Sequence, residues 1–184
     1  MPDRLHFTGD DEADVLLATE PLALLIGFAL DQQVTVPTAF AGPLKLKQRL
    51  GKLDAKTIAQ TDPATLEEAF RQKPAIHHFP GAMATRVQDL CATIVEDYGG
   101  KAERVWSEAA DGADLKRRLA SLPGFGPMKV TSLGAVLAKR FDVAVAQDLV
   151  PAHPTLGDVD SADALERYQA AKRDYKASLK PKSA

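Results

Sequence analysis

The chain has 184 residues, enough to bury a hydrophobic core without disulfides or metal ions, and its 45% hydrophobic and 26% charged residues are typical of a soluble globular protein. The single cysteine, Cys91, excludes an internal disulfide, and it excludes a zinc site or iron–sulfur cluster built on several thiolates. The longest apolar run, Pro21–Leu30, is too short to cross a membrane, and the first residues show no basic-then-apolar leader. A cytoplasmic protein without a membrane partner is therefore expected.

The net charge of −2 argues weakly against binding to nucleic acid, but the charge is unevenly distributed. Residues 1–115 hold 11 Lys/Arg and 18 Asp/Glu, a net of −7, whereas residues 116–184 hold 12 Lys/Arg and 7 Asp/Glu, a net of +5. The part of the chain that could meet a phosphate backbone therefore begins near residue 116. A solvated, lysine-rich C-terminal tail would give the same pattern.

Helical periodicity runs through the first hundred residues. Apolar residues between 22 and 30 form one helix face, and Asp62-Pro63 supplies the cap and first residue of a helix that runs to about Gln72. The clearest amphipathic helix ends at Gly99-Gly100 and has its apolar residues three and four apart: Val87, Leu90, Cys91, Ile94, Val95 and Tyr98.

Two further amphipathic segments flank a short break, with Leu115 and Leu119 facing inward before it and Val130, Leu133 and Leu137 after it. Ser161 caps a last helix. The β-branched run Val143–Val145 is too short to found a sheet, so the sequence predicts an all-α fold, a compact array of about eight helices with short connections.

The break between these segments reads LPGFG, residues 122–126. Gly124 and Gly126 carry no Cβ, so the backbone can turn tightly and approach another molecule closely. Pro127 suits the first position of a new helix, whose free N–H groups can bind an anion, and Lys129 adds a cation nearby. This pattern predicts a helix-hairpin-helix that grips a nucleic-acid phosphate without reading sequence. An ordinary loop between two packed helices is the alternative.

Three segments, in this order along the chain, resemble the helix-hairpin-helix base-excision DNA glycosylases, a superfamily that includes endonuclease III: LLIGFALDQQVTVPTAF (24–40), GAMATRVQDLC (81–91) and LPGFGPMKV (122–130). The chain also looks like a small bacterial subgroup without an iron–sulfur cluster. The resemblance implies one two-lobed, all-α domain over residues 1–184. Residues 20–130, with the hairpin at 116–137, form the main helical lobe, and residues 1–19 and 141–184 complete the second lobe.

The resemblance also implies a chemistry and a set of site residues. Duplex DNA is bound, a base is flipped out, and an Asp supports the positive charge that develops on the sugar as the base departs. That Asp follows the hairpin by about 20 residues in the family, and Asp148 lies 20 residues beyond Met128. A surface acid that caps the next turn is the alternative for Asp148.

The hairpin residues Gly124, Phe125, Gly126, Met128 and Lys129 are expected to contact DNA. Gln32 and Gln33 match the position where a Gln fills the gap left by the extruded base, with Gln33 the closer match, although polar residues at a helix end would look alike. Asp31 stands where relatives usually have Ser, which puts an extra acid near DNA.

Family members that are also lyases carry a nucleophilic Lys two residues after the second glycine, where this chain has Met128. Lys129 is one residue later, about 100° around the helix, so it is expected to point elsewhere as a phosphate contact or a solvated lysine. The prediction is a monomeric, monofunctional DNA glycosylase with no cofactor other than a monovalent cation at the hairpin. A non-catalytic DNA-binding module of the same fold and an all-α scaffold for protein partners are the alternatives.

Overall fold

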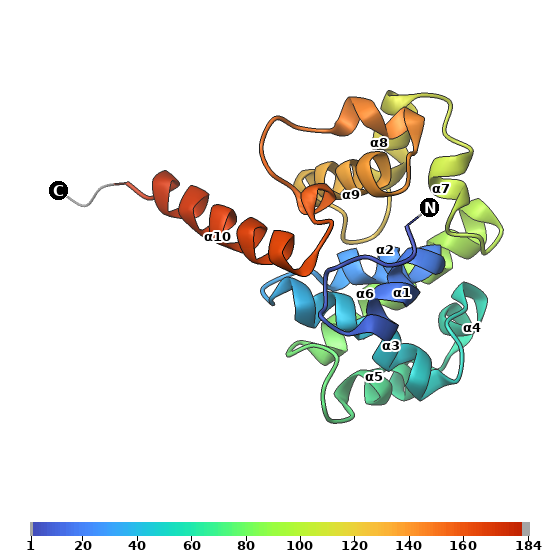
Figure 1. Ribbon diagram of the computed structural model, residues 1–184. Coiled ribbons are helices and arrows are strands. Elements are labelled where there is room, and N and C mark those ends of the chain that lie inside the picture. Colours follow the sequence, from blue (N-terminus) through green and yellow to red (C-terminus); the bar gives the residue numbers. More distant parts are fainter. Residues whose placement is uncertain (1, 182–184) are drawn as a thin grey trace.

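The computed structural model describes residues 2–181, where helices are the only regular secondary structure and no β-strand is present, so the all-α prediction is confirmed (Figure 1). Its ten α-helices are α1 (Asp11–Thr19), α2 (Pro21–Leu30), α3 (Val36–Leu50), α4 (Ala55–Gln60), α5 (Pro63–Arg71), α6 (Pro80–Tyr98), α7 (Arg104–Ser107), α8 (Gly112–Ala120), α9 (Pro127–Arg140) and α10 (Ala162–Leu179). Two 3-10 helices, η1 (Ala144–Leu149) and η2 (Leu156–Asp158), lie between α9 and α10.

The helices form two groups, one above the other in Figure 1. The N-terminal group, α1 to α6, surrounds α2, whose residues from Leu22 to Leu30 are all buried. A helix that is apolar on every side needs partners on every side, and α2 packs against α1, α3 and α6. The hairpin group contains α7, α8 and α9, with η1 and η2 packed on α9. The division of the chain into lobes stays a prediction, and α1, which falls within residues 1–19, packs on α2 and α3.

Capping residues fix most of the helix boundaries. The side chains of Asp62 and Ser161 accept hydrogen bonds at the starts of α5 and α10, as the sequence predicts. Gly99 has a left-handed φ of 63° at the end of α6, as predicted for the Gly99-Gly100 pair. Over residues 2–181 no single helix is long and apolar enough to span a membrane; α1 and α2 pass such a test only as a pair bent by 113°.

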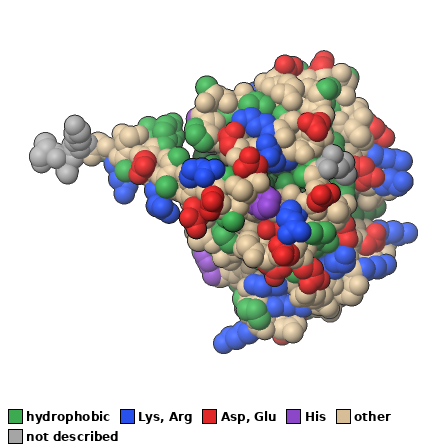
Figure 2. Space-filling model, viewed as in Figure 1, with side chains coloured by type: hydrophobic (Ala, Val, Ile, Leu, Met, Phe, Trp, Pro, Cys, Tyr) green, Lys and Arg blue, Asp and Glu red, His purple; other side chains and the backbone are tan. Residues whose placement is uncertain are grey.

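The last helix, α10, projects away from both groups (Figure 1). Only its first turn is buried, through Ala164 and Leu165. Lys and Arg side chains gather along the projecting part (Figure 2), which includes Lys172, Arg173 and Lys176. The start of α10 therefore lies against the body, and its remainder presents a basic surface to solvent.

Candidate nucleic-acid interface at the hairpin

The predicted hairpin between α8 and α9 is present. The turn is closed by the Phe125 N–H, which donates to the Leu122 carbonyl at 3.1 Å, and the side chains of Leu122 and Phe125 are both buried. These two apolar anchors hold the turn against the core while Gly124 and Gly126 stay exposed. Phe125, expected from the sequence to contact DNA, is thus the anchor of the hairpin and is only 5% exposed.

The two glycines of the hairpin are needed for different reasons. Gly124 has φ +83°, which favours glycine, and a Cβ built on it would lie 2.6 Å from Cδ of Arg86, so a larger residue would also displace that side chain. Gly126 has φ −79° and ψ 177°, an ordinary extended conformation, and no heavy atom of residues 2–181 lies within 4 Å of a Cβ built on it. Neither backbone strain nor packing therefore requires a glycine at position 126.

Gly126 is also the N-cap of α9, and no side chain of the described residues caps this helix. The first helical hydrogen bond runs from the Val130 N–H to the Gly126 carbonyl at 3.1 Å. The N–H groups of Met128 and Lys129 precede that bond and point out of the helix start, where the helix dipole is positive. Such a helix start can bind an anion.

Lys129 extends from this helix start toward the end of α2. Its Nζ donates to the Ala29 carbonyl at 3.2 Å, and the side chain is half-buried. Burial and, to a smaller extent, the Arg86 guanidinium lower the pKa of Lys129 to about 8, although the Asp31 carboxylate opposes both effects. Lys129 is therefore not a freely solvated lysine. Its contact with a phosphate stays a prediction.

Arg86 on α6 joins the hairpin to the end of α2. Its side chain packs against Gly124, and its guanidinium donates to the Gln32 side-chain oxygen. The Gln32 carbonyl lies 3.0 Å from Nε2 of His77, whose Nδ1 accepts from the Phe79 N–H at 3.0 Å. Because Nδ1 accepts, the ring proton is assigned to Nε2 and His77 is neutral, which fits a pKa lowered by burial.

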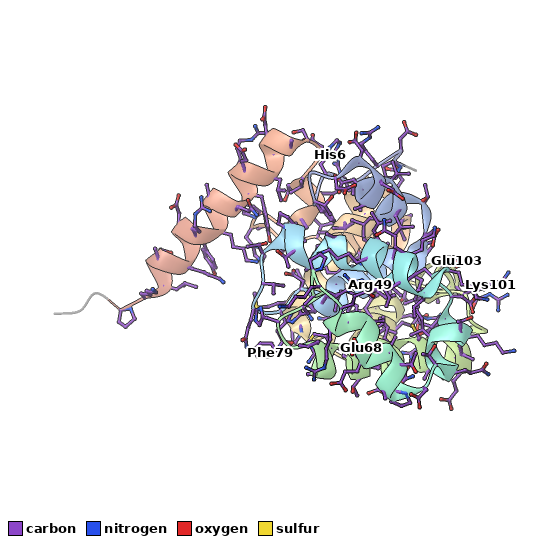
Figure 3. All side chains as sticks on the ribbon, turned by 90° about the horizontal axis from the view of Figure 1, so that it is seen from below. His6, Arg49, Glu68, Phe79, Lys101 and Glu103 are labelled. Carbon is purple, nitrogen blue, oxygen red and sulfur yellow. The ribbon has the colours of Figure 1, made fainter. Side chains whose placement is uncertain are left out.

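Lys129, Arg86, Gln32 and His77 form a cluster between the hairpin and the end of α2. Three exposed residues border this cluster. Gln33 has a left-handed φ of 57°, which is uncommon for a residue with a Cβ, and its side chain is exposed. Met128 is 80% exposed at the start of α9, and Phe79 is 46% exposed. Phe79 lies at the edge of the body on the side from which α10 projects (Figure 3). Large exposed apolar side chains beside an anion site can contact the bases of a nucleic acid.

Asp148 lies elsewhere. It is exposed in η1, and a Cβ built on Gly112, the first residue of α8, would be 2.7 Å from its carboxylate. The hairpin follows the opposite end of α8, so about 13 Å of helix separates the two. The side chain of η1 that is buried is the methyl group of Ala146, so η1 turns no carboxylate toward the core. The catalytic role expected of Asp148 stays a prediction, without support from this position.

Another carboxylate, Asp31, lies within the cluster at the C-cap of α2. Burial raises the pKa of Asp31, and the ammonium groups of Lys172, Lys129 and Lys176 oppose that rise. These lysines belong to α9 and α10, so positive charge from two other helices acts on Asp31. Asp31 in turn contributes to the raised pKa of Tyr168 on α10, which is about 12, mainly because the phenol is buried.

The sequence predicts the hairpin and Gln32 as site residues but not Arg86, His77 or Lys172. Arg86 adjoins the apolar stripe of a predicted helix, a position that is also common for surface arginines. No local pattern distinguishes it, because its partners Gln32 and Gly124 are distant in the chain.

A family described as HhH-GPD superfamily base excision DNA repair protein matches residues 26–180. A solved structure, described as a trapped endonuclease III–DNA covalent intermediate in an estranged-adenine complex, is similar with a TM-score of 0.49 and 17% sequence identity, covering 81% of this chain and 72% of that chain. No curated protein matches the chain.

Proposed function

The chain belongs to the HhH-GPD superfamily of base excision DNA repair proteins, and on that premise we propose that it binds duplex DNA through the start of α9 and hydrolyses the N-glycosidic bond of a damaged or mispaired base. The proposal rests above all on Gly126. Its backbone is unstrained and the space where its Cβ would lie is open, so neither strain nor packing is the reason for a glycine at this position. Close approach of another molecule to the backbone supplies that reason.

The charges around Gly126 favour a phosphate as that molecule. The uncapped start of α9 carries positive potential, and the Arg86 and Lys129 side chains lie close enough to influence each other. Backbone N–H groups and cations of this kind bind the sugar–phosphate backbone and position the protein without reading sequence. Three exposed side chains beside the cluster then lie within reach of bases that leave the stack: Met128, Phe79 and Gln33.

The proposed reaction is hydrolysis, without strand cleavage by a lysine. The thioether of Met128 cannot form a Schiff base with the sugar, and the Lys129 amine donates to the Ala29 carbonyl. Water is therefore the nucleophile, and a carboxylate that stabilises the charged sugar is the main chemical requirement.

A non-catalytic DNA-binding module is the second candidate. The observation that favours it is the exposed position of Asp148 beside Gly112, at the far end of α8 from the hairpin. A protein of this kind would bind duplex DNA with the same salt dependence and release no base.

Duplex binding by Gly126→Ala tests the proposal. The added methyl group meets open space, so the melting temperature falls only slightly, through the poorer N-cap that alanine makes, but affinity for duplex DNA falls by about tenfold or more because a backbone–phosphate contact is obstructed. Gly51→Ala is the matched control: Gly51 has φ +83° and no described atom within 4 Å of its Cβ, so this variant loses stability and keeps its affinity. Unchanged binding by Gly126→Ala would remove the main support for DNA at the start of α9.

Base release separates the two candidates. Duplexes that each carry one lesion are incubated with the wild type, and free base is measured. Release from at least one duplex establishes a glycosylase, whereas salt-dependent binding without release from any of them favours the non-catalytic module.

A further inference from the structure

Asp31 is half-buried, but no contact within the described part of the fold explains why a carboxylate is placed there. Among residues 2–181, no donor hydrogen-bonds to its carboxylate and no ion pair within 4.0 Å includes it. Other acids removed from solvent have partners: the buried Asp14 accepts from Thr8 at 2.9 Å, and the half-buried Asp54 accepts from the Thr57 N–H at 2.8 Å. Because removing a carboxylate from water without a hydrogen bond costs free energy, packing alone does not account for an acid at position 31.

The surroundings of Asp31 are basic and come from separate elements. Lys129 projects from α9, and Lys172 and Lys176 project from α10, near enough for all three to favour the ionised carboxylate. None of them forms a direct ion pair with it among the described residues, so the carboxylate oxygens remain available to a ligand.

Residues next to Asp31 in the chain contact side chains that lie at the hairpin. The next residue, Gln32, accepts from Arg86, and Arg86 packs against Gly124. Ala29, two residues before Asp31, accepts from Lys129 of α9. A DNA strand bound at the start of α9 would therefore run beside Asp31, whereas Asp148 lies at the other end of α8.

We infer that Asp31, rather than Asp148, is the carboxylate that faces the sugar of an extruded nucleotide and stabilises its positive charge during base release. This inference rests on the proposed function. As the bond between C1′ and the base nitrogen breaks, its electron pair leaves with the base and the sugar ring becomes cationic. Water then adds its hydroxyl to C1′, and its proton goes, in net, to the base nitrogen. The anionic carboxylate stabilises the cationic sugar before water adds.

The test measures affinity for a charged sugar and needs no knowledge of the substrate base. Two duplexes are compared, identical except that one carries a cationic pyrrolidine at an abasic position and the other an uncharged tetrahydrofuran. The wild type is expected to prefer the pyrrolidine duplex by about tenfold or more, since a mimic of the transition-state charge binds more tightly. Asp31→Asn lowers the ratio of affinities to about 1, and Asp148→Asn leaves it at the wild-type value.

A wild type without this preference, or an Asp31→Asn variant that keeps it, overturns the inference. Loss of the preference in Asp148→Asn alone would assign the role to Asp148. If Asp31→Asn does not fold, Asp31→Ser provides the same measurement with a smaller uncharged side chain. Failure of the proposed function gives a separate result, because the wild type would then bind neither duplex in a salt-dependent way.

Discussion

The two helices of the hairpin motif begin in opposite ways. At the start of α8, the Asp111 carboxylate accepts from the Asp114 N–H at 2.8 Å, the Asp114 carboxylate accepts from the Ala110 N–H at 3.0 Å, and Asp148 packs on Gly112. At the start of α9, Gly126 offers no side chain, and the nearby charged groups include Arg86 and Lys129. Both starts carry the same positive helix dipole.

The difference shows how one motif can direct an anion to one end. At the start of α8, the Asp114 N–H is occupied by the Asp111 carboxylate, and the carboxylates gathered there repel phosphate. The N–H groups of α9 are left to an external partner. By this comparison Asp148 is one of the carboxylates at the capped start of α8, whereas Asp31 lies near the uncapped start of α9. The following predictions test the two ends separately.

The largest effect is expected at Gly124. Gly124→Ala places a Cβ at φ +83° and 2.6 Å from Cδ of Arg86, which displaces the arginine from Gln32. The strained backbone and the displaced side chain together lower the free energy of unfolding by about 2 kcal/mol. Duplex binding weakens as well, because Arg86 leaves the start of α9. Urea unfolding and duplex titration measure both effects.

Gly51→Ala again serves as the control for Gly124→Ala. It adds the same backbone strain without a contact, so it is expected to lose about 1 kcal/mol of stability and no affinity. Equal losses of affinity in the two variants would mean that reduced stability, and not the position of Arg86, weakens binding.

The next largest effect is on the occupied start of α8. Asp111→Ala removes the side-chain cap and lowers the free energy of unfolding by about 1 kcal/mol. Affinity for duplex DNA stays the same or rises slightly, because a negative charge is lost far from the bound strand. A fall in affinity comparable to that of Gly126→Ala would place DNA at both helix starts and contradict the comparison.

The two carboxylates are expected to differ in stability as well as in binding. Because burial raises the pKa of Asp31 in the folded protein, its ionised form costs stability at pH 7, and the cost disappears below the ordinary carboxyl range, where both states are protonated. Asp31→Asn therefore raises the melting temperature at pH 7 by roughly 1–3 °C and has little effect near pH 3.

Asp148→Asn provides the reference in the same experiment. The exposed Asp148 side chain is expected to change the melting temperature at neither pH. A loss of stability in Asp31→Asn at pH 7 would show that Asp31 is a stabilising partner of the lysines. It would then need no ligand to explain it.

The sequence predicts the local parts of this arrangement and misses the parts that depend on distant contacts. The hairpin follows from Gly124, Gly126 and Pro127, since turn conformation and helix start are properties of adjacent residues. The position of Asp148 depends on how η1 packs between α8 and α9, where Ala146 is buried and the acid lies beside Gly112, at the end of α8 opposite the hairpin. Counting residues from the hairpin cannot reveal that packing.

The cluster around Asp31 shows the same limit. Its members lie between residues 31 and 176: Lys129 of α9 donates to Ala29 near the end of α2, and Lys172 and Lys176 of α10 add their charge to the surroundings of Asp31. The sequence marks Asp31 as a departure from relatives that carry Ser, but only the fold places lysines around it. Long-range convergence of charged groups has no periodic signature in a sequence.

The smallest effect concerns the charge of Lys129. Its pKa of about 8 means that Lys129 is charged at pH 7 and mostly neutral at pH 9. If Lys129 contributes to phosphate binding at the start of α9, the decrease of log affinity with log salt concentration becomes shallower by about 1 between pH 7 and pH 9, since one fewer cation is available. Lys129→Gln is expected to show the shallower slope at both pH values.

Lys116→Gln, which alters an exposed lysine on α8, is the control and keeps the pH dependence of the wild type. A wild-type slope that does not change from pH 7 to pH 9, together with a normal slope in Lys129→Gln, would limit Lys129 to its bond with the Ala29 carbonyl and leave Arg86 and the α9 N–H groups as the anion site.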